Sequence, residues 1–182
     1  MISRFIACFL IGCCICVCTV SAQDIASLGS RFDNDLRSWI YYDSLAEEIG
    51  TLEMTWPGKD DWTEWNYRLG DDSGDIQLKW SDDPNLWELT GYEGTITMRT
   101  QWARDFSTWR VQGSDGTLVF RSRYRNDYNE WYLEDEARGV FAIYTTKTGD
   151  PRDWEIIDEL DSDISLDTKL ALIFLAMYHS LP

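Results

Sequence analysis

The chain has 182 residues, with 32 acidic residues against 16 basic ones, ten tryptophans and a single histidine. This acidic excess argues against nucleic-acid binding through a broad basic surface, and against charge attraction to an anionic membrane. The length is enough for one domain with a substantial core. We therefore expect neither nucleic acid nor an anionic membrane as a partner.

The first 22 residues have the composition of an export signal. Arg4 supplies a basic start, an apolar run follows to Val20, and Val20-Ser21-Ala22 provides small residues for cleavage. We expect residues 23–182 to form one exported domain, periplasmic or extracellular. Leu10-Ile11-Gly12-Cys13 also fits the pattern for lipoprotein acylation at Cys13, but the apolar residues after it favour simple cleavage near Ala22.

All five cysteines lie inside this segment, at Cys8, Cys13, Cys14, Cys16 and Cys18. The expected domain therefore has no disulfide and no cysteine metal site, and its stability must come from packing.

An internal repeat of about 22 residues organises the rest of the chain. Six tryptophans follow one another at intervals of 26, 22, 22, 22 and 23 residues: Trp39, Trp65, Trp87, Trp109, Trp131 and Trp154. Four residues before each stands an aspartate: Asp35, Asp61, Asp83, Asp105, Asp127 and Asp150. A fixed period of this kind indicates one structural unit used repeatedly.

Each unit has the pattern of a β-hairpin. In the fourth unit, Ile96, Met98 and Trp102 alternate with polar residues, which is typical of a half-buried strand. The same alternation places Trp56, Trp80 and Tyr124 on the buried faces of their strands. After the aspartate turn, each repeat tryptophan begins the apolar face of a second strand. Six such units predict about twelve antiparallel strands.

The C-terminal segment predicts a helix near residues 166–180. Ser165 is a suitable N-cap, and Asp167 favours the positive end of the helix. Residues 170–178 are all apolar, so the helix has no polar face and must be buried or lie in a membrane. At 1.5 Å per residue it spans about 22 Å, less than the roughly 30 Å of a hydrocarbon core.

We therefore predict an all-β domain of six hairpins closed into a barrel around an apolar C-terminal helix. Closure removes exposed strand edges and surrounds the helix with apolar side chains. A β-trefoil also has six hairpins but leaves the helix unexplained. An open hairpin solenoid is the other architectural alternative.

Twelve strands followed by an apolar C-terminal helix resemble the superfamily of tubby C-terminal domains, LURP-one proteins and phospholipid scramblases. Residues 131–143 resemble a sequence pattern that recurs in that group, in which aromatic and alternating residues are followed by Asp, Gly and a second alternating run. Residues 167–175 resemble the group's final helix, where a Lys precedes the apolar run. The resemblance implies a barrel around a central helix. It implies little about activity. Tubby domains bind phosphoinositides through basic residues, and this sequence has no comparable Lys/Arg cluster.

Two groups of residues are candidate binding sites. The repeated aspartates, among them Asp61, Asp83, Asp105 and Asp127, are expected at one rim, where they are candidate ligands for Ca²⁺. A turn-capping role explains them more simply, because a carboxylate in a turn accepts its own backbone N–H groups. The spaced tryptophans are expected in the core. Trp62, Phe106 and Tyr128, three residues before a repeat tryptophan, are expected to form an exposed patch that stacks on sugars.

Catalysis has little support in the sequence. His179, the single histidine, lies at the predicted helix end, which argues against a Ser-His-Asp triad or a histidine metal site. We therefore expect a non-catalytic binding or scaffold module without a cofactor, whose partner is a protein or a glycan. The alternative is a carbohydrate-binding or glycan-hydrolysing protein that uses turn aromatics and rim carboxylates.

Overall fold

The structure, a computed structural model, describes residues 24–181, so the predicted export signal and all the cysteines lie outside the described residues. The strands are β1 (Ser27–Phe32), β2 (Asp35–Tyr42), β3 (Glu48–Trp56), β4 (Asp61–Leu69), β5 (Asp72–Leu78), β6 (Leu86–Thr90), β7 (Thr95–Trp102), β8 (Asp105–Gly113), β9 (Gly116–Tyr124), β10 (Asp127–Asp135), β11 (Gly139–Lys147) and β12 (Asp150–Leu160). A 3-10 turn, η1 (Pro57–Lys59), links β3 to β4, and one helix, α1 (Leu166–His179), follows β12.

Every strand pairs antiparallel with its neighbours in sequence, and β1 pairs with β12 to close the barrel. At this closure Leu28 of β1 stands opposite Trp154 of β12. The predicted closed barrel of twelve strands is therefore confirmed, and neither a trefoil nor an open solenoid describes the chain.

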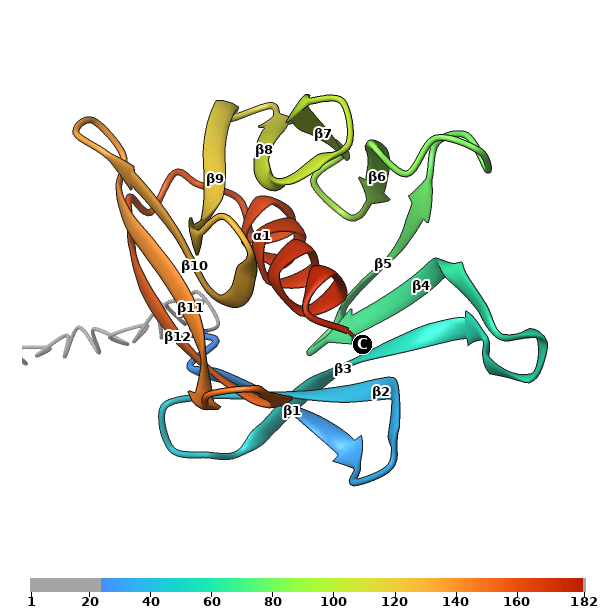
Figure 1. Ribbon diagram of the computed structural model, residues 1–182. Coiled ribbons are helices and arrows are strands. Elements are labelled where there is room, and N and C mark those ends of the chain that lie inside the picture. The colour runs from blue at the N-terminus through green and yellow to red at the C-terminus, as the bar shows by residue number, and fades with distance from the viewer. Residues whose placement is uncertain (1–23, 182) are drawn as a thin grey trace, which may run out of the picture.

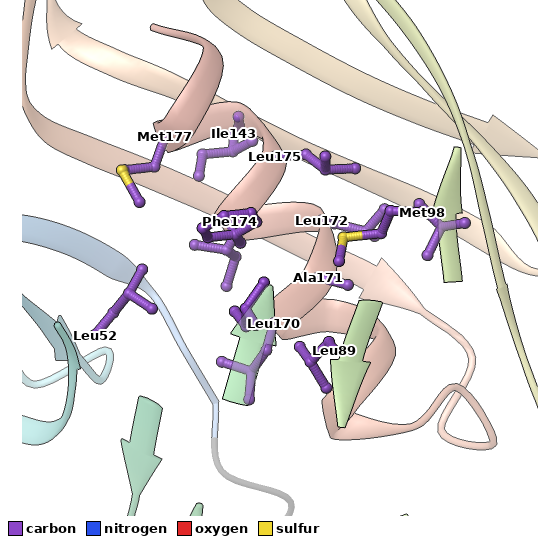
Figure 2. Packing of buried hydrophobic residues seen from close by; sticks show 14 of the residues in the cluster. Leu52, Leu89, Met98, Ile143, Leu170, Ala171, Leu172, Phe174, Leu175 and Met177 are labelled. Carbon is purple, nitrogen blue, oxygen red and sulfur yellow. The ribbon is translucent and has the colours of Figure 1, made fainter. Parts of the chain in front are cut away.

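Helix α1 occupies the inside of the barrel, as predicted (Figure 1). Ser165 caps it, since the Ser165 hydroxyl accepts a hydrogen bond from the Thr168 N–H at 3.2 Å. Residues 170–177 are all buried. Figure 2 shows Leu170, Phe174 and Leu175 leaving the helix in different directions, with strand residues such as Leu89 and Met98 around them. A helix that is apolar on every side is stable here because the barrel covers every side.

The six repeat tryptophans form the wall around this helix. Each is at most 1% exposed, which confirms the core interpretation. Phe174 of α1 packs against two of them, with ring centroids 5.0 Å from Trp87 and 6.1 Å from Trp65. Each buried indole removes roughly 150–250 Å² from water, so large rings at fixed intervals fill the space between helix and strands.

The repeat gives the barrel two different ends. One end, called here the Asp rim, carries the turns that precede β2, β4, β6, β8, β10 and β12, and α1 finishes there at His179. The opposite end, called here the start rim, surrounds the beginning of α1. None of the helices in residues 24–181 is both long and apolar enough to cross a membrane.

One part of the strand prediction is wrong. Trp56, Trp80, Trp102 and Tyr124 are 46%, 59%, 66% and 58% exposed, although the alternation placed them on buried faces. Where β3 and β7 approach the Asp rim, their pairing register shifts just before Trp56 and Trp102. Residues beyond the shift lie at the open rim instead of over the helix, so alternation no longer reports burial there.

Candidate functional site

Each of the six repeat aspartates at the Asp rim belongs to a hydrogen-bonded motif, Asp-x-polar-x-Trp. The carboxylate accepts the backbone N–H of the residue two positions later, and a polar side chain at that same position also donates to it. These aspartates and donors are Asp35 with Arg37, Asp61 with Thr63, Asp83 with Asn85, Asp105 with Ser107, Asp127 with Asn129, and Asp150 with Arg152.

The tryptophan at the end of the motif adds a further bond. Its indole N–H donates to the carbonyl three residues earlier in five of the units, as from Trp65 to Trp62 at 2.9 Å and from Trp131 to Tyr128 at 2.8 Å. In the third unit, the Trp87 indole N–H is buried with no partner among the described residues. The pairing register shifts at the turns of these same five units, so the aspartate and the tryptophan fix the extra residues there, whereas the β5–β6 pairing of the third unit has no shift.

These contacts occupy the carboxylates that the calcium hypothesis requires as ligands. Side-chain hydrogen bonds from Thr63, Asn85 and Ser107 lower the pKa values of Asp61, Asp83 and Asp105 respectively. Within residues 24–181, no three carboxylates, histidines or cysteines come together in a group that would hold a metal ion. Asp61, Asp83, Asp105 and Asp127 are thus each engaged in their own turn, and the structure does not gather them into one site.

The three turn aromatics are half-buried instead of forming an exposed patch. Phe106 and Tyr128 pack against His179 at the end of α1, with ring centroids 5.2 Å and 6.4 Å away. They therefore close the barrel around the helix end. Trp62 differs from them, because it lies beside the repeat tryptophan Trp65, at 5.9 Å between centroids, and also lines a pocket.

This pocket, called here the rim pocket, is the strongest candidate site at the Asp rim. It has a volume of about 620 Å³ and lies between β2, the turn before β4 and the end of α1. Its aromatic lining is Trp62, Tyr178 and His179, and its polar lining includes Asp35, Arg37 and Asp60. Indole and phenol surfaces thus stand next to carboxylate and guanidinium groups.

Hydrogen bonds hold the polar groups of the rim pocket in place. Arg37 forms a two-point ion pair with Asp35, with Nε to Oδ1 at 2.7 Å and Nη2 to Oδ2 at 3.0 Å, and this bonding lowers the Asp35 pKa. The other terminal nitrogen of Arg37 donates to the Pro57 carbonyl at 3.0 Å. Asp60 accepts the Trp62 indole N–H at 2.9 Å. The pocket therefore has a preorganised lining.

His179 does not have the environment of a catalytic base. Its ring stacks on Phe106 and on Trp109, 4.9 Å away, and its Nε2 is buried with no partner in the described part of the chain. Burial lowers the His179 pKa to about 3, so the ring is neutral at pH 7 and unready to take a proton.

The start rim holds a second group of carboxylates. Asp115 accepts the Ser165 N–H at 2.9 Å, the Ser165 hydroxyl at 2.7 Å and the Thr168 hydroxyl at 2.9 Å. Burial acts to raise the Asp115 pKa, but these hydrogen bonds outweigh it and the pKa is lowered. Asp115 thereby fixes the beginning of α1 to the turn between β8 and β9.

Asp167 makes a similar connection from the helix to the barrel. Its two oxygens accept the Tyr67 hydroxyl at 2.5 Å and the Glu93 N–H at 2.9 Å. Burial, with the nearby charges of Asp167 and Asp115, raises the Glu93 pKa. Lys169 adds an ion pair with Asp158 at 2.6 Å. All these groups are used in holding the helix, so this cluster is a structural anchor.

The barrel brings together basic residues that are dispersed along the sequence. Six exposed arginines gather on and beside β7, β8 and β9: Arg99, Arg104, Arg110, Arg121, Arg123 and Arg125. They are separated along the chain by up to eleven residues and only the strand pairing brings them together. The rim pocket has no signal in the sequence, although the polar residue two positions after every repeat aspartate is a usable signal for the motif beside it.

Fold and sites together define a closed antiparallel barrel with an occupied interior, whose accessible sites lie at a rim or on the outer face. Comparison with protein-family models, with curated proteins and with solved structures finds no match for this chain.

Proposed function

We propose that this protein is an exported, non-catalytic binding module and that the rim pocket binds a carbohydrate. The observation that carries the proposal is the position of Trp62 and Tyr178 in an open pocket of about 620 Å³ lined by carboxylate and guanidinium groups. Helix α1 fills the interior, so a ligand of this protein binds at a rim or outside the barrel.

The lining of the rim pocket has the chemistry that a sugar requires. The C–H face of a pyranose packs on an aromatic ring, and neighbouring hydroxyl groups pair with charged planar groups such as Arg37 and Asp60. Because Arg37 is fixed by Asp35 and by the Pro57 carbonyl, its remaining N–H donors are oriented before a ligand arrives.

The charged groups of the pocket also support binding over hydrolysis. Glycoside hydrolysis requires a carboxylic acid whose pKa is raised so that it can protonate the leaving group. The Arg37 ion pair lowers the Asp35 pKa instead. His179, which also lines the pocket, has a lowered pKa and offers no substitute acid at neutral pH.

Titration calorimetry with neutral hexasaccharides tests this proposal. The domain is titrated with cello-, xylo-, manno- and chito-hexaose, and at least one is expected to bind. Trp62→Ala is expected to weaken that binding at least tenfold. Trp80→Ala is the matched control, because Trp80 is 59% exposed at the same rim but does not line the rim pocket.

Trp62→Phe guards against a folding artefact, because it keeps an aromatic surface over Trp65 and is expected to retain most of the affinity. Failure of all four sugars to bind the native domain would overturn the proposal, as would an equal loss of affinity in the Trp80 and Trp62 variants.

A further inference from the structure

The charges of this protein are divided unequally around the barrel. Residues 95–126 contain six arginines and two acidic residues, whereas the other 150 residues contain ten basic and thirty acidic residues. A protein with a net charge of −16 therefore has one cationic face.

Strand pairing places these arginines side by side on the outer face. Arg99 of β7 stands directly opposite Arg110 of β8. Arg110 in turn stands opposite Val119 of β9, and Arg121 lies two residues beyond Val119 and so shares its outward direction. Because neighbouring strands are about 4.8 Å apart, the row extends roughly 10 Å across the three strands.

Much of this positive charge is not neutralised within the protein. Arg123 pairs with Glu130 at 3.0 Å and Arg125 with Asp105 at 3.8 Å. Within residues 24–181, no carboxylate lies within 4.0 Å of the guanidinium groups of Arg99, Arg104, Arg110 or Arg121. Like charges directly opposite one another destabilise a sheet, and a bound anion would offset that cost.

A groove runs beside these arginines. It has a volume of about 730 Å³, and its lining includes Trp102, Arg104, Arg121, Arg123, Arg125 and Tyr132. Trp102 is 66% exposed, and the Arg121 guanidinium lies over the Tyr132 ring at 4.8 Å from its centroid. An accessible indole therefore stands within the same groove as four guanidinium groups.

We propose that this arginine groove binds an acidic polysaccharide, a chain of sugars bearing carboxylate or sulfate groups. Guanidinium groups bind such anions with two parallel hydrogen bonds, and Trp102 provides a stacking surface for the sugar rings. The site is distinct from the rim pocket and does not depend on the function proposed for that pocket.

The acidity of the remaining surface selects this partner over other polyanions. A single polysaccharide chain can follow the narrow cationic face without approaching the acidic faces. An anionic membrane is a broad surface, and duplex DNA carries one charge per roughly 1.7 Å of its axis, so the acidic remainder of the barrel repels both more strongly.

The test is titration calorimetry with a decasaccharide of galacturonate at low salt, with a sulfated decasaccharide as the second probe. Arg104→Gln/Arg121→Gln removes two groove arginines whose loss leaves no carboxylate unpaired. This double variant is expected to weaken binding at least tenfold. Arg68→Gln, an exposed arginine on β4, is the matched control and is expected to have little effect.

Three further measurements make the result specific. Affinity is expected to fall as salt rises. Trp102→Ala is expected to weaken binding of both decasaccharides but not of free sulfate ions. Trp62→Ala, which alters only the rim pocket, is expected to leave galacturonate binding unchanged, so failure of one site is distinguishable from failure of the other.

Several outcomes would overturn the inference. These are absence of binding to either decasaccharide, equal weakening by Arg68→Gln, or tighter binding of a single-stranded oligonucleotide or of vesicles containing phosphatidylserine than of the decasaccharides. Unfolding curves of every variant must match that of the native protein, which is expected because all the altered arginines are exposed.

Discussion

Phe174 provides the sharpest test of the idea that α1 is the core of the barrel. Its side chain is fully buried and contacts the rings of Trp65, Trp87 and Tyr178. Replacing a buried phenylalanine with alanine removes its transfer free energy and leaves a cavity, which together cost about 3–5 kcal/mol. Because domains of this size are stable by about 5–15 kcal/mol, the Phe174→Ala variant is expected to lose a large fraction of its stability.

Urea unfolding followed by tryptophan fluorescence measures this loss. The slope of free energy against urea concentration is expected to stay constant, so the change appears in the midpoint. Phe174→Leu keeps most of the volume and is expected to cost less than about 1.5 kcal/mol. Ile157→Ala on the outer face of β12, where Ile157 is 43% exposed, is the control and is expected to cost less than about 1 kcal/mol.

A loss of unfolding free energy in Phe174→Ala that is no greater than in Ile157→Ala would contradict this role of the helix. That result would mean that the helix does not fill the barrel in solution, and the argument that ligands bind only at the rims and outer face would fail with it.

Three other consequences of the structure can be measured. Asp115→Asn weakens the anchor of α1 and is expected to lower the free energy of unfolding by about 1–3 kcal/mol in urea at pH 7. Because the pKa of Asp115 is lowered in the folded state, its contribution to stability is present above the unfolded pKa and is lost as pH falls. The free energy of unfolding of the variant should therefore decrease less on acidification than that of the native protein. His179, with its pKa lowered to about 3 from 6.5, stays neutral in the folded state, so its ring signals in proton NMR should not shift between pH 8 and 5, and its contribution to stability should decline as pH falls below 6.5. Asp105→Ala, which removes the acceptor of the Ser107 N–H and hydroxyl, should cost about 1–2 kcal/mol by thermal unfolding, and Ser107→Ala about half as much; equal unfolding free energies for native protein and Asp105→Ala would contradict the role given to the motif.

The architecture could be predicted from the sequence because every unit contains a large apolar side chain that must be buried. A tryptophan such as Trp109 at a fixed place in each hairpin needs burial, and residues 170–178 need burial on every side. A closed barrel around a helix satisfies both demands at once, and the predicted helix boundaries differ from α1 (Leu166–His179) by a single residue.

The burial of residues at the rims could not be predicted, because alternation no longer reports burial where the strand pairing register shifts. Trp102 follows the apolar series of Ile96 and Met98 in sequence, yet the register shift after Thr100 leaves it 66% exposed. The shift depends on the hydrogen bonds between Asp105 and Ser107, and these are visible only as a polar residue two positions after each aspartate. Single-residue periodicity contains no information about such a turn.

The arginine face was hidden for a different reason. Adjacent strands of this barrel are about eleven residues apart in sequence, so Arg99, Arg110 and Arg121 are neighbours in space but not in the chain. Inward positions are constrained at every strand by the helix they must cover, whereas outward positions have no packing requirement. Charge can therefore accumulate on one outer face at little cost to the core. In the arginine groove, the side chains that hold the barrel together and those proposed to meet a ligand therefore lie on opposite faces of the same strands.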